Sequence, residues 1–282
     1  MSKLLILDCN YYLHRNFHAL PPKYSSSGLP IAALHGAVYS IRKTIRHVNP
    51  THILAAFDIG GITARHRLLP TYKSGRPPTD PHLAAQLYPL IEVVTAMGLC
   101  VVALDGVEAD DVIASAAFKA EHYGMTVVIS TGDKDLCQCV TESTTLYNPF
   151  SKTNPITDEQ GVQDKYGVMP FQFADYLALV GDSSDSISGV PGFGPKSAAK
   201  YLGEWGVLEE LLKHNDLLVG KLGQVFRDNM ETARLCRSLT TVRRDIRIGK
   251  TMSDLRVRKP LDSLPTLEAK YEFRPVKSLF NT

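Results

Sequence analysis

Short runs of apolar residues, each bounded by turn residues, recur through the first half of the chain. Four have the length and composition of buried strands, namely Leu4 to Leu7, Ile53 to Phe57, Leu99 to Leu104 and Thr126 to Ser130. Longer stretches with helical periodicity lie between them, namely Ala32 to Val48, Pro81 to Met97 and Ala109 to His122. Strands that alternate with such helices predict a mostly parallel sheet covered on both faces. Residues 1–150 are therefore predicted to form an α/β domain.

The pattern changes after Asn148, where strand-like runs nearly stop and helical patterns take over. The helical stretches are Met169 to Val180, Pro195 to Tyr201, Val207 to Lys213 and Asn229 to Arg237. We expect a helical region over 151–250, joined to the sheet by the Pro-, Ser- and Asn-rich stretch Asn148 to Asp158. Residues 251–282 have a weak pattern and are expected to be either a packed extension or a partly mobile tail.

Acidic residues follow all four predicted strands. In chain order they are Asp8, then Asp58, then Glu108, Asp110 and Asp111, then Asp133 and Asp135, while Asp182 and Asp185 open the helical region. The carboxyl ends of parallel strands meet at one crevice, so these acids are expected to lie together. Acids at a helix start also favour the helix dipole. That explanation covers the acids from 108 to 111 but not Asp8 and Asp58, which directly abut apolar strands.

Crowded carboxylates repel one another and raise each other's pKa unless cations neutralise them. Ligation by carboxylates alone, without Cys or clustered His, selects Mg²⁺ or Mn²⁺ over zinc. Two such ions about 4 Å apart stabilise the attacking and leaving oxygens of a phosphoryl displacement. The acids therefore predict phosphodiester hydrolysis, although a simple phosphatase would satisfy the same argument.

The net charge hides an uneven distribution. The 282 residues contain 31 Lys and Arg and 29 Asp and Glu, a formal charge of +2. Without the nine clustered acids, the rest of the chain has a balance of +11, which suits binding to a nucleic-acid backbone.

The cysteines and the start of the chain bear on the cellular compartment in which the protein is expected. Five cysteines are few and odd in number, and the start MSKLLILD lacks the apolar stretch of a signal peptide. Cys137 and Cys139 lack a second Cys pair or a nearby His at zinc-finger spacing, and we expect small buried thiols rather than a metal site. No apolar run approaches the roughly 20 residues that span a bilayer. We expect a cytoplasmic protein without a membrane segment.

Basic residues follow Asp58 in the segment RHRLLPTYKSGRPP, which contains Arg65, Arg67, Lys73 and Arg76 with Tyr72 among them. Such a segment is either a cationic arm that grips phosphates beside the metal ions or an ordinary solvated loop. His14 and Arg15 lie in a helix expected to include Tyr11 to Phe17. They could stack on a base or contact a phosphate, or they could be ordinary residues of an amphipathic helix.

The segment GVPGFGPKSAAKYL has Gly192, Gly194 and Ser197 at nearly the spacing of a dinucleotide loop. No strand precedes it, no Walker sequence is completed, and Pro195 stands where a helix would begin. A hairpin between two helices fits better, with its backbone close to a phosphate and Lys196 beside it. An ordinary Gly/Pro turn is the alternative.

These motifs, in this order, closely resemble the 5′ nuclease (flap endonuclease) family, which includes the N-terminal domain of bacterial DNA polymerase I and phage and stand-alone 5′ nucleases. The resemblance covers about Leu4 to Ile246 and rests on Asp8, FDIGGITARHRLLPTYKSGRPP, GVEADDVIAS, STGDKDL and GDSSDSISGVPGFGPKSAAKYL. It implies a PIN-like α/β sheet followed by a helical region with a helix-hairpin-helix motif. The implied activity is Mg²⁺-dependent flap endonuclease and 5′-3′ exonuclease cleavage at single-strand/duplex junctions of DNA, in replication or repair, by a monomer.

The resemblance also implies residue roles. The ligands of a first metal ion would be Asp8, Asp58, Glu108, Asp110, Asp111 and Asp133, and those helping to hold a second would be Asp135, Asp182 and Asp185. Lys73 and Arg76 would be catalytic and belong to a helical arch or gateway for a 5′ single strand. The implied DNA contacts are His14, Arg15, Arg65, Tyr72, Gly192, Phe193, Gly194, Pro195, Lys196 and Ser197. A potassium ion beneath the hairpin would be held by the main chain of Leu179, Val180, Ser188, Val190 and Phe193.

The sequence also departs from the family pattern. Cys9 follows Asp8 where Gly is usual, Ser186, Ser188 and Phe193 replace common hairpin residues, and His14 stands where an aromatic ring often stacks on DNA. Two other functions stay open, a structure-specific DNA-binding homologue with weak or lost catalysis and a metal-dependent ribonuclease on the same sheet. Retention of all nine acids favours the nuclease over the first, and the hairpin favours DNA over the second.

Overall fold

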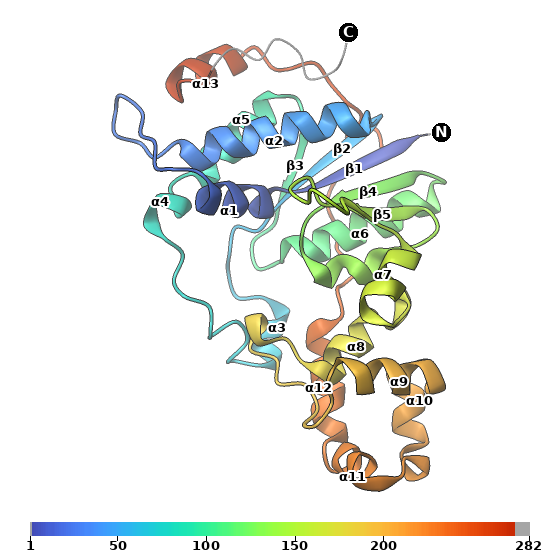
Figure 1. The fold of residues 1–282 in the computed structure, drawn as a ribbon. Coiled ribbons are helices and arrows are strands. Elements are labelled where there is room, and N and C mark those ends of the chain that lie inside the picture. The colour runs from blue at the N-terminus through green and yellow to red at the C-terminus, as the bar shows by residue number, and fades with distance from the viewer. Residues whose placement is uncertain (1, 274–282) are drawn as a thin grey trace.

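A six-stranded sheet forms the centre of the first half of the chain (Figure 1). The computed structural model describes residues 2–273. The strands follow the order β3-β2-β1-β4-β5-β6, with every neighbouring pair parallel except β5 and β6. Their bounds are β1 Lys3–Asp8, β2 His52–Phe57, β3 Cys100–Ala103, β4 Thr126–Ser130, β5 Thr144–Tyr147 and β6 Ile156–Thr157.

Helices cover both faces of this sheet because both faces are apolar. In β1, Leu4 and Ile6 pack in one buried cluster with α6 (Ala109–His122), whereas Leu5 and Leu7 pack in a second cluster on the other face. That second cluster contains α1 Cys9–Ala19, α2 Ala32–Val48 and α5 Leu87–Ala96. The prediction of a mostly parallel sheet covered on both sides is confirmed.

The predicted helix from Pro81 to Met97 is two helices, α4 (Pro81–Ala84) and α5. Pro89 stands in the first turn of α5. A proline has no N–H to donate and its ring clashes with the carbonyl four residues earlier, so a continuous helix cannot pass through this position.

The predicted join from Asn148 to Asp158 folds back onto the sheet. Asn148 N donates to Pro155 O at 2.7 Å, and β6 pairs antiparallel with β5. The sheet therefore runs past residue 150. The sequence did not reveal β5 and β6 because β5 (TTLY) contains no run of apolar residues and β6 has only two residues.

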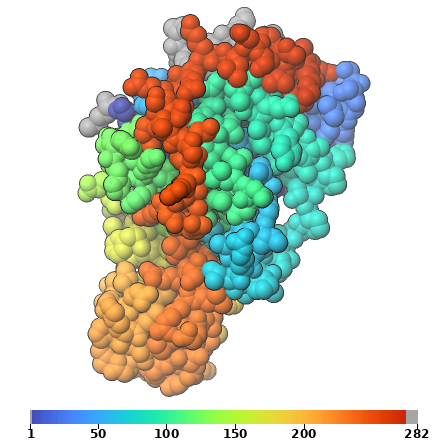
Figure 2. Space-filling model, turned by 180° about the vertical axis from the view of Figure 1, so that it is seen from behind, coloured from blue at the N-terminus to red at the C-terminus, as the bar shows by residue number. Residues whose placement is uncertain are grey.

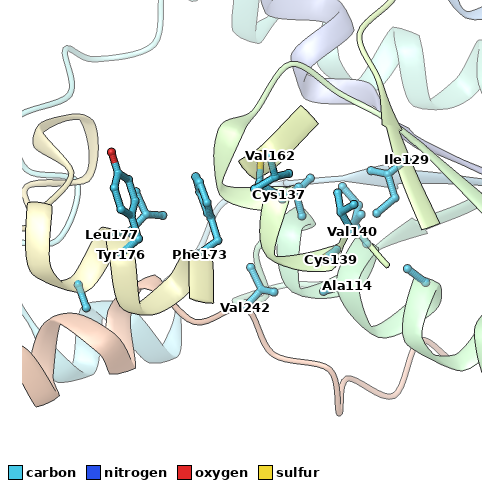
Figure 3. Packing of buried hydrophobic residues seen from close by; sticks show 14 of the residues in the cluster. Ala114, Ile129, Cys137, Cys139, Val140, Val162, Phe173, Tyr176, Leu177 and Val242 are labelled. Carbon is cyan, nitrogen blue, oxygen red and sulfur yellow. The ribbon is translucent and has the colours of Figure 1, made fainter. Parts of the chain in front are cut away.

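The second half is helical, as expected. Its helices are α7 Glu159–Tyr166, α8 Phe173–Val180, α9 Pro195–Trp205, α10 Leu208–Lys213, α11 Gly220–Asp228 and α12 Met230–Thr240. Short 3₁₀ turns accompany them and β4, at η1 Lys134–Cys139, η2 Pro170–Gln172, η3 Ser183–Asp185 and η4 Asn215–Leu217. Phe173 and Leu177 of α8 belong to the same buried cluster as Ala114 of α6 and Val140 (Figure 3). The helical region and the sheet thus share one core.

The C-terminal segment is a packed extension as far as residue 273. It crosses the back of the molecule (Figure 2) and reaches the amino end of β2, where Ile53 N donates to Leu255 O at 2.7 Å. Helix α13 (Leu264–Lys270) then lies against α5, with Leu264 and Tyr271 buried in the second cluster. The rest of the predicted extension, 274–282, lies outside the described residues. Within the described part of the chain, no helix is both long and apolar enough to cross a membrane.

Candidate active site

Asp8 and Asp58 lie at the carboxyl ends of neighbouring strands. Asp8 ends β1 and caps α1, accepting hydrogen bonds from Tyr11 N at 3.1 Å and from Thr131 Oγ1 at 2.7 Å. The side chain of Asn10 exchanges two hydrogen bonds with the backbone of Asp58, at 2.8 and 2.9 Å. These bonds fix the two strand ends beside each other and beside the end of β4.

The end of β4 carries Asp133 and Asp135 on a tight turn. Asp133 N donates to Thr131 Oγ1 at 3.0 Å, and Asp135 N donates to Asp133 Oδ1 at 2.9 Å. The intervening Gly132 is in such close contact with Tyr11 that a Cβ there would collide with the ring. A glycine is therefore required for this turn to approach α1.

Burial, and after it the charge of neighbouring carboxylates, raises the pKa of three of these acids. Burial raises the pKa of Asp8 to about 6, with Asp133 and Asp58 adding to the shift. Burial and then Asp133 raise the pKa of Asp135 to about 8, and burial, Asp133 and Asp8 raise the pKa of Asp110 well above its usual range. Asp133 is thus the common neighbour of three carboxyl groups whose pKa values are raised.

The remaining acids face basic side chains. Glu108 lies 3.1 Å from Arg65 and 3.2 Å from Lys73, and Asp185 pairs with Arg76. Asp182 Oδ2 lies 2.7 Å from Lys134 Nζ. Burial would raise the pKa of Asp182, but hydrogen bonds from Lys134 and Ser184 lower it below its usual value.

Arg65, which is predicted to contact DNA, is buried within the fold. Its guanidinium is buried and donates to both oxygens of Asp111 at 2.9 Å, to Glu108, and to the carbonyls of Leu239 and Thr241. All five N–H groups are used, so none is left for a phosphate. Asp111 is correspondingly committed, because Oδ1 also accepts from Arg243 N at 2.9 Å. In this structure Asp111 links α3 (Ala64–Leu68) and the end of α12 to α6 through these contacts, and its predicted metal ligation stays a prediction.

Tyr72, another predicted DNA contact, is also buried. Its hydroxyl contacts Glu108 at 3.2 Å and Asp185 at 2.9 Å. Lys73 beside it has a positive φ of 58° and donates its N–H to Asp185 O at 2.9 Å, which turns its side chain toward Glu108. The connection from 69 to 80 contains turns but no helix, so the predicted arch is a loop here.

His14 and Arg15 lie on α1 with exposed side chains. Partial burial and the neighbouring charges of His18 and Arg76 lower the pKa of His14, which favours the neutral ring. The Arg15 guanidinium lies 5.9 Å from the centre of the Phe150 ring. Both side chains are accessible, and His14 lies near enough to Arg76 for that charge to act on its pKa.

The hairpin before α9 exposes its backbone. Gly192 has a φ of 81°, and Gly194 caps α9, where Gly194 N donates to Ser197 Oγ at 2.9 Å. Pro191, Gly192, Pro195 and Lys196 are exposed. The ring of Phe193 is buried, 5.8 Å from that of Phe226. Phe193 can therefore contact DNA only through its main chain.

The base of the hairpin is formed by two glycines in close contact. A Cβ on Gly181 would lie 2.7 Å from Ser188 O, and one on Gly189 would lie 2.7 Å from Leu179 O. Val190 N also donates to Leu179 O at 2.8 Å. Main-chain carbonyls from the two sides of the hairpin are therefore brought close together.

The capacity of these acids to hold a metal ion depends on how they are placed. Across residues 2–273, no three Asp, Glu, His or Cys side chains stand in an arrangement that could hold an ion. Glu108, Asp182 and Asp185 are each paired with a basic side chain of the protein. The donor set nevertheless fits a hard cation, because it is all carboxylate. Asp135 Oδ1 is buried without a hydrogen-bond partner, as expected of an oxygen that a cation would satisfy.

Sequence reasoning missed several residues that position the acids. Asn10 and Thr131 act through hydrogen bonds, which leave no periodic signal in a sequence. Lys134 lies between the predicted ligands Asp133 and Asp135 in the sequence. This position was the sequence signal that could have indicated its ion pair. Lys134 and Asp133 also line a polar cavity of about 700 Å³ that reaches Lys165 and Tyr166.

Comparison with known proteins identifies the family. Residues 3–167 match the N-terminal resolvase-like domain of 5′-3′ exonucleases, and residues 168–263 match their C-terminal SAM fold. The chain belongs to the 5′-3′ exonuclease family. The division at 167 places the whole sheet, including β6, in the N-terminal domain.

Nearly the whole chain matches two kinds of relative, one of similar length and one about three times longer. It is 33% identical to the 5′-3′ exonuclease of Aquifex aeolicus, covering 99% of this chain and 94% of that protein. It is 36% identical to the DNA polymerase I of Mycobacterium bovis, covering 99% of this chain but 32% of the polymerase. The chain thus spans about a third of the length of the polymerases that it matches.

Solved structures share the fold. The T5 D15 protein co-crystallised with metal ions has a TM-score of 0.72 at 21% identity, covering 85% of this chain and 89% of that one. The catalytic core of Rad2 in complex with a DNA substrate has a TM-score of 0.63 at 16% identity, covering 97% and 89%. Both support the predicted architecture of an α/β sheet followed by a helical region.

Proposed function

We propose that this protein is a Mg²⁺-dependent, structure-specific 5′ nuclease that hydrolyses DNA phosphodiesters near a single-strand/duplex junction. The observation that carries the proposal is the position of Asp133, whose charge raises the pKa of Asp8, Asp110 and Asp135 at one sheet edge. Such a group of acids needs cations to ionise fully at neutral pH. Family membership supplies the class of reaction.

The acids around Asp133 would hold two divalent ions. Asp8, Asp58, Glu108, Asp110, Asp111 and Asp133 are the proposed ligands of the first, and Asp135, Asp182 and Asp185 of the second. Mn²⁺ could replace Mg²⁺ because both prefer carboxylate oxygen. When bound, the ions would lower the pKa of an attacking water and stabilise charge on the scissile phosphate.

Lys73 and Arg76 are the proposed catalytic cations. Both pair with acids of the site, at 3.2 Å for Lys73 and Glu108. A scissile phosphate would compete for these side chains, since its oxygens accept the same charge-assisted hydrogen bonds. Each cation would then stabilise the negative charge that develops during displacement.

The hairpin would fix the duplex relative to the site. Its backbone at the exposed Gly192 and Pro195 and the half-buried Gly194, with Lys196, suits a phosphate contact that reads no sequence. Carbonyls of Leu179, Val180, Ser188, Val190 and Phe193 are the proposed ligands of a potassium ion at its base. His14 and Arg15 are proposed to contact DNA at the rim of the site.

The proposed substrate is DNA with a 5′ flap or a 5′ end at a duplex junction, bound by a monomer in the cytoplasm. The five cysteines are free thiols in the described structure, consistent with a reducing compartment. A DNA-binding homologue without strong catalysis is the second candidate, favoured by the basic partners of Glu108, Asp182 and Asp185.

The deciding experiment uses a 5′-labelled flap DNA and a matched RNA, each with Mg²⁺ or with a chelator. We expect cleavage of the DNA flap with Mg²⁺ alone. Asp133→Ala should abolish cleavage and retain flap binding in Ca²⁺, whereas Asp164→Ala, on the exposed face of α7, should cleave normally. Absence of Mg²⁺-dependent cleavage by the unmodified protein would refute the nuclease function, and normal cleavage by Asp133→Ala would refute its role.

A further inference from the structure

A strongly basic segment crosses the back of the molecule. Residues 243–259, here called the basic strip, contain seven cationic side chains, Arg243, Arg244, Arg247, Lys250, Arg256, Arg258 and Lys259, against only Asp245 and Asp254. Figure 2 shows the segment that contains the strip running along this face from the helical region toward α13. The net charge of +5 in 17 residues is the highest concentration of positive charge left unexplained by the proposed site.

The strip is held firmly although it has no regular secondary structure. Ser115 of α6 donates to Arg243 O at 3.2 Å and accepts from Ile246 N at 3.0 Å. Val257 N donates to Thr51 O at 3.1 Å, and Leu255 is buried. The backbone is therefore fixed along two elements of the core, and its basic side chains are presented on a preformed surface.

Within the described residues, four of the seven cations have neither an ionic partner nor a side-chain hydrogen bond. Arg247, Lys250, Arg256 and Lys259 are exposed, and none forms an ion pair with any residue from 2 to 273. Arg243 and Arg258 pair with the two acids of the strip itself, and Arg244 donates to Gln138 O at 2.7 Å. Four like charges on one fixed segment repel one another, and a polyanion would relieve that repulsion.

The strip begins near the candidate active site and ends at the opposite edge of the sheet. At its start, Arg243 N donates to Asp111 in the first turn of α6. At its other end, residues 255 to 257 pair with Thr51 and Ile53 at the amino end of β2, whereas Asp58 lies at the carboxyl end. Because β2 has six residues, its two ends lie about 20 Å apart. The strip, which runs from one end of the sheet's strands to the other, therefore covers more than half of one turn of duplex DNA, about 34 Å.

We propose that the basic strip binds the phosphate backbone of a duplex arm of the DNA substrate, beyond the part that the hairpin and the acids contact. The inference rests on the proposed function only in taking DNA as the substrate. Regularly spaced phosphates match a row of unpaired cations, and such contacts carry affinity without sequence preference. An acidic protein surface is the other occupant that the charge would fit, and the experiment separates the two.

The test compares Arg247→Gln/Lys250→Gln/Arg256→Gln with a control that removes equal charge elsewhere, Lys23→Gln/Lys43→Gln/Lys152→Gln. Affinity in Ca²⁺ is measured over a range of salt for flap DNA with arms of about 8 or about 30 base pairs. With long arms we expect the strip variant to bind about tenfold more weakly at low salt, with a salt slope smaller by about 2 to 3. With short arms, the variant and the unmodified protein should bind equally.

Unchanged affinity for long arms would overturn the proposal and leave an acidic protein as the occupant. A loss on short arms as large as that on long arms, or an equal loss by the control, would also overturn it. Thermal unfolding of both variants checks that they are folded. Cleavage of the short-armed flap in Mg²⁺ is measured in parallel. Absence of this cleavage would show that the proposed nuclease function fails, whereas the affinity for long-armed DNA tests the strip independently of cleavage.

Discussion

Lys134 Nζ lies 2.7 Å from Asp182 Oδ2 and joins the end of β4 to the turn that follows α8. The Asp182 side chain is 4% exposed and that of Lys134 is 41% exposed, so the pair is only partly screened by water. A divalent ion bound by Asp182 must displace this ammonium or share the carboxylate with it. The second proposed ion site is therefore in competition with a residue of the protein itself.

Lys134→Met should tighten divalent-ion binding. Removing the ammonium frees the carboxylate, and a partly exposed pair is worth up to about 1 kcal/mol, which corresponds to several-fold in affinity. Titration with Mn²⁺, followed by electron paramagnetic resonance, measures the change. Lys165→Met, in the same cavity, is the control and should leave affinity unchanged. Weaker Mn²⁺ binding by Lys134→Met would show that the lysine supports the ion site.

Metal-ion affinity and stability should both depend on pH. Asp8 and Asp135 have pKa values of about 6 and about 8 in the folded protein against a usual 3.8, so the folded state binds more protons than the unfolded state. Without metal, stability should therefore fall as the pH rises from about 4 to 8. Mg²⁺ needs the deprotonated acids, so its stabilising effect should grow over the upper part of that range. Thermal unfolding with Mg²⁺ or chelator measures both trends. In Asp133→Asn, the stability measured without metal should depend less on pH.

Arg65→Met should destabilise the fold without removing a DNA contact. It leaves the buried Asp111 and Glu108 without a major partner, a change that typically costs about 3 to 5 kcal/mol. Urea unfolding without metal gives this value, and flap affinity of the folded variant in Ca²⁺ should be unchanged. Arg67→Met, on the exposed side of α3, is the control and should unfold like the unmodified protein. Weaker flap binding by folded Arg65→Met would restore the original assignment of Arg65 to DNA.

Gly189→Ala should disrupt the base of the hairpin. Its φ is 68°, and an added Cβ would lie 2.5 Å from Gly181 N and 2.7 Å from Leu179 O. Strain of this kind costs about 1 to 3 kcal/mol, and the displaced carbonyls should weaken duplex binding and any gain from K⁺. Gly203→Ala, in α9 with open space around it, should stabilise the protein by up to about 1 kcal/mol. The affinity of both variants for duplex DNA is measured with K⁺ and with Na⁺. Unchanged affinity and an unchanged effect of K⁺ in Gly189→Ala would contradict the proposed ion site.

The sequence alone determined the order of the main strands and helices, because each strand of a buried parallel sheet is an apolar run, such as Leu4 to Leu7. It also placed acids at the strand ends, since the direction of a strand decides which edge its last residue occupies. Only the tertiary structure decided how each acid is used. Asp111 and Asp133 are equally acidic in the sequence, yet one is bound by the buried Arg65 while the other is surrounded by carboxyl groups. That difference depends on partners more than 40 residues away for Asp111, and the free energy of a charge is set by whatever surrounds it in space.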